Sequence, residues 1–144
     1  MPDDAFINSR PVITIAGEQR DDLTDALTGL VVNLPLHGCA HGELTLTNWG
    51  TPADGQTPAY VLDDLALGDE LEIAMGQPDP EPIFKGEITA IEEQYGEGAP
   101  TLNLLLQDKL HRLGRSRQNL SYEEHTPDEI VSAIASEAGL QTDV

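Results

Sequence analysis

His37, Cys39 and His41 are the residues whose types come nearest to those of a metal site. Imidazole nitrogens and a cysteine thiolate are ligands that zinc prefers. On an extended strand the three side chains would share one face, but successive ones would stand about 6.6–7 Å apart, which is too far for one ion without a bend. Two nearby glycines permit a bend, yet no second pair of ligands follows at a typical spacing. A hairpin loop with polar side chains is therefore favoured over a zinc site.

The acidic residues do not form a recognisable catalytic pair, although the chain has 26 Asp and Glu among 144 residues. In pairs such as Glu92-Glu93 the carboxylates are adjacent, and adjacent side chains on a strand point to opposite faces. The sequence also has no G-x-S-x-G elbow, no phosphate-binding glycine-rich loop and no H-E-x-x-H helix. We expect no catalytic residue, no cofactor and no bound metal, and we predict that the protein is not an enzyme.

A short basic segment is the strongest charge feature of the chain. Lys109, Arg112, Arg115 and Arg117 supply four of the seven Lys and Arg residues, and no Asp or Glu occurs from Lys109 to Tyr122. In a self-associating acidic protein, such a segment complements the acidic surface of a neighbouring copy. Salt bridges within the same chain are an equal alternative. We predict that these four residues contact another subunit.

Trp49, Tyr60 and Tyr95 form a third candidate, an aromatic platform for sugars or peptides. A tryptophan at the end of a strand more often packs in the core or at its rim. Packing is therefore the favoured interpretation of these residues, and the platform is the alternative.

The elements that must position these residues are mostly strands. Residues 43–49 alternate apolar and polar side chains, so Leu44 and Leu46 share one face of a strand. Similar patterns predict strands over 11–16, 30–34, 70–76, 83–91 and 101–107. Glycine and proline mark the loops, at 36–42, 50–58, 78–82 and 96–100. We predict a small antiparallel β-barrel, since closure leaves no long free edge.

The last segment changes from a strand pattern to a helix pattern. Thr126 suits the N-cap position, a proline follows at the first helical position, and Glu129 is placed to complete a capping box. Ile130 and Ile134 then form an apolar stripe, and Gly139 suits the residue after the helix. The spacing predicts a short C-terminal α-helix.

Composition excludes several classes of protein. The formal net charge is −19 and the pI is near 4.1, which repels phosphate and makes specific nucleic-acid binding unexpected. No apolar run reaches the roughly 18–20 residues of a membrane span. No basic and apolar N-terminal pattern of a secretory signal is visible, and a single cysteine excludes an intrachain disulfide.

The acidity itself has alternative explanations. It is typical of a soluble protein or of one from a salt-adapted host. A sharper alternative is an acidic wall that repels polyanions passing through a channel.

Several motifs, in order, resemble the N-terminal barrel of phage late-control D proteins, VgrG spikes and the hub proteins of contractile tails. A Phe-x-Gly-x-Ile strand begins at Phe84 and follows a Gly-x-x-Leu-x-Ile strand that begins at Gly68. The hairpin strand 43–48 precedes both motifs, and 108–115 resembles the family's Asp-x-x-x-Arg-Leu strand exit. The helix segment from Thr126 to residue 140 is similar to the helix between the family's two barrels.

The resemblance implies a structural hub that adapts a hexameric tail tube to a trimeric spike. Its implied partners are further copies in a homotrimer, the tube protein, the spike protein, and a tape-measure or cargo protein in the lumen. Its implied place is the baseplate or tail tip of a virion or injection particle that is assembled in a bacterial or archaeal cytoplasm. A small cell-wall or glycan-binding β module is the alternative function, and it would use Trp49 and Tyr60.

The resemblance also implies a division of the chain. Residues 1–118 would form a hub-type barrel domain, and 119–144 a linker and helix that begin an inter-barrel segment. Family members continue into a second barrel that this sequence lacks. A split hub, a truncated hub and a partner chain that supplies the rest are all compatible with that difference.

Overall fold

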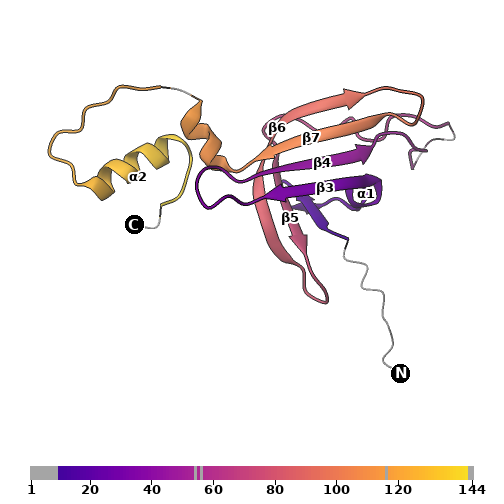
Figure 1. The fold of residues 1–144 in the computed structure, drawn as a ribbon, viewed down its shortest axis with the longest axis horizontal. Helices are drawn as coiled ribbons and strands as arrows, with labels where there is room; N and C mark the ends of the chain where they lie inside the picture. The colour runs from indigo at the N-terminus through magenta and orange to yellow at the C-terminus, as the bar shows by residue number, and fades with distance from the viewer. Residues whose placement is uncertain (1–9, 54, 56, 116, 143–144) are drawn as a thin grey trace.

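A computed structural model describes residues 10–53, 55, 57–115 and 117–142 and shows a mainly β protein with a short C-terminal helix (Figure 1). Its strands are β1 (Val12–Ile15), β2 (Glu18–Gln19), β3 (Leu27–Asn33), β4 (His41–Thr47), β5 (Glu70–Met75), β6 (Glu81–Gln94) and β7 (Thr101–Gln107). Its helices are α1 (Asp21–Ala26), the 3-10 helix η1 (Lys109–Gly114) and α2 (Pro127–Glu137).

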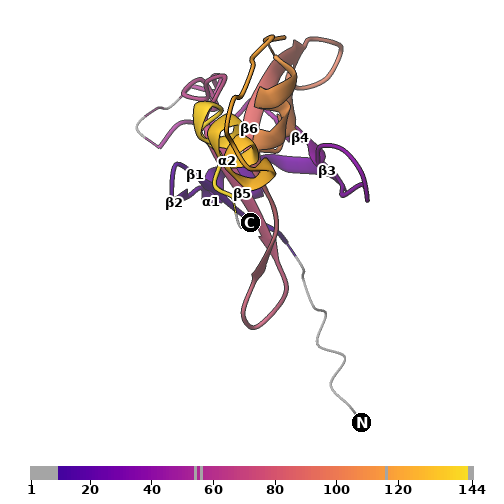
Figure 2. The same ribbon diagram turned by 90° about the vertical axis from the view of Figure 1, so that its left-hand side faces the viewer.

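The strands form one antiparallel sheet in the order β2-β1-β5-β6-β7-β4-β3. The sheet bends along β6, which has 14 residues. The first half of β6 pairs with β5, and from Glu87 onwards β6 pairs with β7. Glu87 lies opposite both Glu70 and Gln107, so it stands where the two halves of the sheet meet. Figures 1 and 2 show the β5–β6 hairpin projecting from the rest of the sheet.

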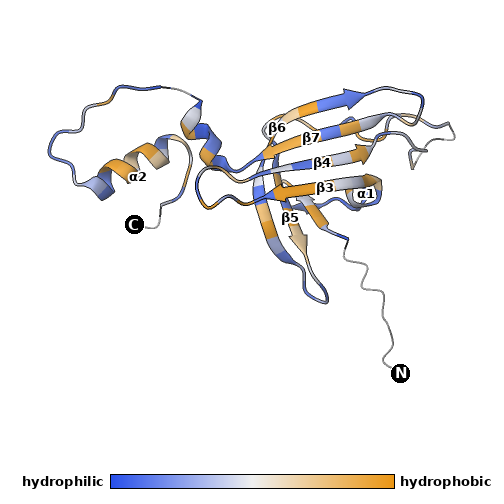
Figure 3. Ribbon diagram, in the orientation of Figure 1, coloured by the Kyte–Doolittle hydropathy of each residue, from blue (hydrophilic) through white to orange (hydrophobic). Residues whose placement is uncertain are grey.

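Alternate strand positions supply the core, as the period-two pattern predicts. Leu44 and Leu46 of β4 are fully buried on one face, and Leu71 and Ile73 of β5 are buried likewise. Figure 3 shows the resulting alternation of apolar and polar residues along the strands. The other buried apolar side chains of this cluster are Ile13, Ile15, Leu23, Leu62, Phe84, Ile88, Leu102, Leu104 and Leu106.

The predicted strands coincide with β1 and β3 to β7, and the predicted helix with α2. β7 matches the predicted strand 101–107 throughout, whereas β6 is longer than 83–91. Glu81 and Pro82, which were expected in a turn, instead begin β6 and pair with Met75 and Ala74. Between β2 and β3, Asp21–Ala26 forms the helix α1.

The predicted closed β-barrel is wrong. Among the described residues, β2 and β3 are the two ends of the ladder and do not pair with each other. Helix α1 connects them, contacts β1 and β4, and places the buried Leu23 in the core. Leu62 enters the same core from the loop before β5. A helix and a loop thus supply core side chains where a barrel would need another strand pair, and the sheet stays open.

The Phe-x-Gly-x-Ile motif fixes the close approach of β6 and β7. Phe84 and Ile88 are buried in the core. A Cβ atom at Gly86 would lie 2.3 Å from the carbonyl oxygen of Gln107 and 2.8 Å from the Phe84 ring. Only glycine lets a backbone approach a neighbour this closely. The glycine of the motif therefore allows β6 to carry Glu87 to the junction of the sheet.

We expect Gly86→Ala to lower the free energy of unfolding by about 1–3 kcal/mol or more, because the added methyl group overpacks the β6–β7 junction. The matched control is Gly98→Ala in the exposed β6–β7 turn, where a Cβ would meet nothing within 4 Å. The control should change stability by no more than about 0.5 kcal/mol. Urea unfolding measures both values, and equal effects of the two variants would contradict this role for Gly86.

Candidate subunit-contact region and its ion-pair junction

The basic segment begins in the 3-10 helix η1, and Asp108 fixes the start of that helix. Asp108 Oδ1 accepts a hydrogen bond of 3.0 Å from the Leu110 amide, as an N-cap does. Its Oδ2 accepts 2.6 Å from the Ala40 amide, and the Asp108 amide donates 2.9 Å to the Ala40 carbonyl. These bonds tie η1 to the turn between β3 and β4. The predicted strand exit at 108–115 is therefore a capped 3-10 helix.

Arg112 of η1 forms a two-pronged ion pair with Glu87 of β6. Its Nε donates 3.1 Å to Glu87 Oε2, and its Nη2 donates to Glu87 Oε1. Glu87 is 3% exposed. The hydrogen bond from Arg112 lowers the pKa of Glu87 against the opposing effect of burial, and the same bond raises the pKa of Arg112. Bidentate, charge-assisted pairs of this kind are the strong ones.

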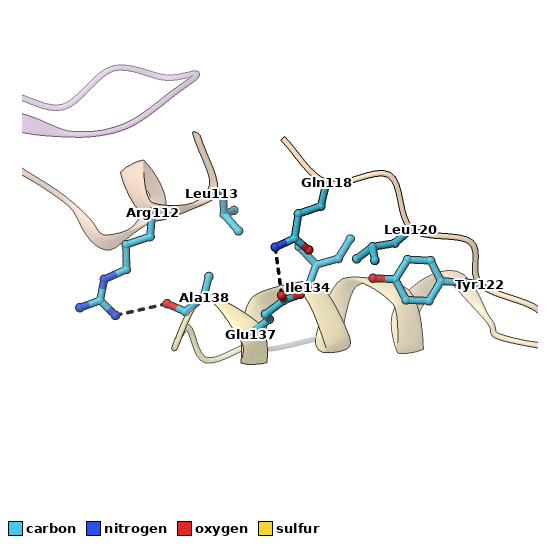
Figure 4. A pocket seen from close by; sticks show the side chains of 8 residues that line it. All are labelled: Arg112, Leu113, Gln118, Leu120, Tyr122, Ile134, Glu137 and Ala138. Carbon is cyan, nitrogen blue, oxygen red and sulfur yellow. Dashed lines mark hydrogen bonds between the residues drawn. The ribbon is translucent and has the colours of Figure 1, made fainter. Parts of the chain in front are cut away.

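The same guanidinium also holds the C-terminal helix. Arg112 Nη1 donates 3.2 Å to the carbonyl oxygen of Ala138, the C-cap of α2 (Figure 4). A Cβ atom at Gly139 would lie 3.0 Å from this nitrogen, and Gly139 has a φ of 69°. Gly139 thus both ends the helix, as predicted, and leaves room for the arginine. One side chain joins the bend of the sheet to the end of α2.

The N-terminus of α2 is built as its sequence predicts. The side chain of Thr126 accepts from the backbone at Glu129, and Glu129 Oε2 accepts 2.8 Å from the Thr126 amide. This reciprocal pair is the predicted capping box. Of the apolar stripe, Ala135 is buried, whereas Ile134 and Val131 are exposed. The helix therefore covers only part of its apolar face.

A groove of about 420 Å³ lies between α2 and the chain that leads to it. Leu120 and Tyr122 face Ile134 across it, and Gln118 Nε2 donates 3.1 Å to Glu137 Oε1 (Figure 4). Arg112 closes one end of the groove. The groove contains no cluster of nucleophilic or acid-base side chains among its described lining residues.

The remaining basic residues of the segment divide into two kinds. Lys109 donates to Glu70 of β5 in a second ion pair, and this bond lowers the pKa of Glu70. Arg115 donates 2.7 Å to His111 Nε2, while His111 Nδ1 donates 2.6 Å to the Asp108 carbonyl. Both bonds are satisfied together when the His111 proton is on Nδ1. Arg117 is exposed and forms no ion pair with a described residue.

Ion pairing within the chain therefore accounts for five of the seven basic side chains. The pairs join Arg10 to Asp25, Arg20 to Asp22 and Asp64, Lys85 to Glu72, Lys109 to Glu70, and Arg112 to Glu87. Among the described residues, Arg115 and Arg117 are the two that pair with no carboxylate. The four predicted subunit-contact residues therefore fall into two halves. The inner half, Lys109 and Arg112, binds carboxylates of its own chain, and the outer half, Arg115 and Arg117, is exposed to solvent.

Three partners of the basic segment were not predicted from the sequence: Glu87, Asp108 and the Ala138 carbonyl. Glu87 carried one signal, because it is a charged residue between Gly86 and the apolar Ile88 within the Phe-x-Gly-x-Ile motif. A carboxylate in such a run must be paired or neutral. Asp108 carried a second signal, because an Asp side chain commonly accepts a hydrogen bond from the backbone amide two residues later, here that of Leu110.

The residues weighed as zinc ligands do not converge. His37 is exposed and Cys39 is half-buried in the turn that joins β3 to β4, and the exposed His41 is the first residue of β4. Burial and the neighbouring Asp108 raise the pKa of the Cys39 thiol. No group of three His, Cys, Asp or Glu side chains in the described part of the chain is placed to hold a metal ion. The favoured hairpin interpretation is confirmed by the antiparallel pairing of β3 with β4.

The three aromatic residues do come together, at the far end of β7 from η1. The rings of Trp49 and Tyr60 meet edge to face at 5.4 Å, and those of Tyr60 and Tyr95 at 6.4 Å. The phenol of Tyr95 donates to the Glu93 carboxylate, which raises the pKa of Tyr95 to about 12. We call Trp49, Tyr60 and Tyr95, with Glu93, the aromatic cluster.

A buried asparagine holds the aromatic cluster in place. Asn48 Oδ1 accepts 3.1 Å from the Val61 amide and 2.9 Å from the Leu62 amide. An isolated antiparallel bridge pairs Gly50 with Ala59. These bonds keep the chain beside Tyr60 against the end of β4. The cluster is a fixed feature of this surface, and its rings lie outside the apolar core.

No known protein family profile and no curated protein sequence matches this chain. Among solved structures, it is similar to the 43 kDa tail protein of prophage MuSo2 from Shewanella oneidensis, with a TM-score of 0.64 and 15% sequence identity. The similarity covers 94% of this chain and 40% of the tail protein, so the chain spans less than half the length of that structure. At this identity the similarity establishes the fold. Separately, each helix in the described part of the chain is too short or too polar to cross a membrane.

We expect Glu87→Gln to lower the free energy of unfolding by about 2 kcal/mol at pH 7, because it removes a charged hydrogen-bond partner of Arg112. The native pKa of Glu87 is depressed. Its contribution is therefore complete above the ordinary glutamate value of about 4.3 and is lost as the pH falls through the lower native value. The difference between wild type and Glu87→Gln should shrink over that range.

Urea unfolding at a series of pH values measures this difference. Other carboxylates with depressed pKa values, such as Glu70 and Asp22, titrate in both proteins and cancel. The control is Glu43→Gln, an exposed glutamate of β4, which should show a small and constant difference. A Glu87→Gln difference that stays constant or grows in acid would contradict the ion pair.

We expect Arg112→Lys to keep a positive charge beside Glu87 but to lose the hydrogen bond to the Ala138 carbonyl. The planar guanidinium of arginine donates to both groups at once, whereas the compact ammonium group of lysine cannot reach both. Amide hydrogen exchange over 128–138 should then quicken by roughly 2–10-fold while exchange in β7 stays unchanged. Arg10→Lys, in an exposed pair, is the control. Unchanged exchange in α2 would show that Arg112 does not hold this helix.

Proposed function

We propose that the chain is a structural protein of a phage tail or of a phage-tail-like injection particle. The observation that carries the proposal is the similarity of 94% of this chain to a prophage tail protein. The order of motifs from strand 43–48 to the helix after Thr126 supports it independently. We assign the chain no catalytic role.

Within that class, we propose a place at the baseplate or tail tip as a hub. There, residues 1–118 would form the unit that tiles a ring, and 119–144 would begin the connection to the next unit. The hub would adapt a hexameric tube to a trimeric spike as a homotrimer. Its partners would be further copies, the tube protein, the spike protein, and a tape-measure or cargo protein in the lumen.

The charge of the chain fits a conduit. A net charge of −19 gives the walls of such a ring a negative potential. Nucleic acid or acidic cargo would then pass without adhering, since like charges repel over about 8–10 Å at physiological salt. The same potential opposes self-association, so the subunit contacts must include basic residues.

A small glycan-binding module is the second candidate, favoured by the exposed Trp49 and Tyr60. Their rings meet edge to face, with an interplanar angle of 82°. Such a pair offers no single flat platform on which a sugar ring stacks. A peptidoglycan pull-down that Trp49→Ala abolishes would favour this candidate, and no binding would remove it.

We expect native mass spectrometry of the purified chain to show closed oligomers, with a trimer of the 15.5 kDa chain as the main species. The trimer should gain population as the protein concentration rises through the micromolar range, because association follows mass action. A chain that remains monomeric up to submillimolar concentration, and that is absent from tail or injection particles of the producing cell, would overturn the proposal.

A further inference from the structure

Two surfaces in the described part of the chain carry exposed side chains that suit a contact with another molecule. One is the aromatic cluster, and the other is the pair Arg115 and Arg117, which we call the free arginines. The inference about them rests on the proposed function, because it concerns how copies of this chain meet in a ring.

The aromatic cluster has the composition of a binding hot spot. Trp49 is 44% exposed, Tyr60 47% and Tyr95 64%. The chain has one Trp, three Tyr and two Phe, so this one surface holds the tryptophan and two of the tyrosines. Trp, Tyr and Arg are the residues most enriched in the centres of protein interfaces. Because Asn48 fixes the chain beneath the rings, little ordering is needed on binding.

The surroundings of the cluster are acidic and lack their own cations. Glu93 touches Tyr95, Glu92 precedes it, and Glu97 lies in the exposed turn that follows. None of these three carboxylates forms an ion pair with a Lys or Arg of the described residues. A partner for this surface must therefore bring positive charge that also packs on aromatic rings, which describes the guanidinium group.

The free arginines are the complementary surface. Both are exposed and follow η1, whose start is fixed by Asp108 and whose middle is fixed by Arg112. Arg115 contacts His111, and this contact leaves its charge without a carboxylate. In a chain with 26 acidic residues, two arginines that lie two positions apart and pair with no described carboxylate form a localised positive site.

The two surfaces lie at opposite ends of β7, so one copy cannot join them to each other. Thr101, at the start of β7, pairs with Gln94 and Thr47, which lie just before Tyr95 and Trp49. Gln107, at the other end, leads into η1. Figure 1 shows the β6–β7 turn and η1 at opposite ends of the sheet.

We propose that the free arginines of one copy bind the aromatic cluster of the next copy. A guanidinium lies over a ring of the cluster and pairs with Glu93 or Glu97. Because the two surfaces differ, the contact is head to tail, and a head-to-tail contact whose rotation closes produces a ring. A single exposed contact of either kind is weak, about 0.5–1 kcal/mol. Two arginines, three rings and several carboxylates act together in each interface.

The test compares variants with identical changes of charge. Arg115→Glu with Arg117→Glu should weaken association at least about tenfold, as measured by analytical ultracentrifugation at constant salt. The control is Arg10→Glu with Lys85→Glu, which adds the same negative charge at two exposed sites outside the segment. The control should change association by less than about threefold, because general charge acts weakly at physiological salt.

Reversing the partner surface completes the test. Glu93→Arg with Glu97→Arg should also weaken association, and all four substitutions in one chain should restore it to within about threefold of wild type. Circular dichroism establishes that each variant is folded. Restored association in the four-substitution chain would indicate that these two surfaces contact each other, because independent damage at the two sites would add up and not cancel.

Three results would overturn the inference. The control could weaken association as much as the arginine variant, the four-substitution chain could stay dissociated, or Trp49→Ala could abolish peptidoglycan binding without affecting association. In the first two cases wild type still forms oligomers, so the proposed hub function stands. The third result would instead favour the glycan-binding module. If wild type forms no oligomer and is absent from tail or injection particles, the proposed function fails with the inference.

Discussion

The ion pair of Glu87 with Arg112 is the interaction on which the arrangement of this molecule depends. A carboxylate at the bend of the sheet would cost several kcal/mol if it were buried without a partner. The strand must nevertheless pass through this point, because Gly86 brings β6 against β7 and the neighbouring Phe84 and Ile88 belong to the core. Arg112 neutralises the buried carboxylate of Glu87, and its Nη1 holds the end of α2 through the hydrogen bond to the Ala138 carbonyl.

This constraint also explains the division of the basic segment. Asp108 fixes where η1 begins, and a short helix that begins there carries Lys109 and Arg112 over the acidic residues of β5 and β6. Arg115 and Arg117 come after the helix has passed that surface. The inner residues hold the protein together, and the outer ones remain available to another molecule. The alternative of salt bridges within the chain is thus observed for Lys109 and Arg112, and contact with another subunit stays a proposal for Arg115 and Arg117.

The sequence predicted those features that local patterns determine. Period-two alternation located β4 and β5, and the Thr126 cap with Gly139 delimited α2, because these signals act within a few residues. Closure of the barrel was a wrong prediction because it depends on which distant segments fill the space between the sheet ends, and here Leu23 and Leu62 do so. The partner of Arg112 could not be chosen from sequence among 26 acidic residues. The aromatic residues were grouped correctly, but the bonds from Asn48 that order them depend on the fold.

The account joins a fold known from a prophage tail protein to two complementary surfaces at opposite ends of β7. Its central claim is that copies of this chain meet head to tail through these surfaces. A cryo-EM map of the assembled ring tests that claim most directly. The account predicts density for Arg115 and Arg117 of each copy against Trp49, Tyr60 and Tyr95 of the next. A ring in which these arginines face solvent and another surface forms the contact would contradict it.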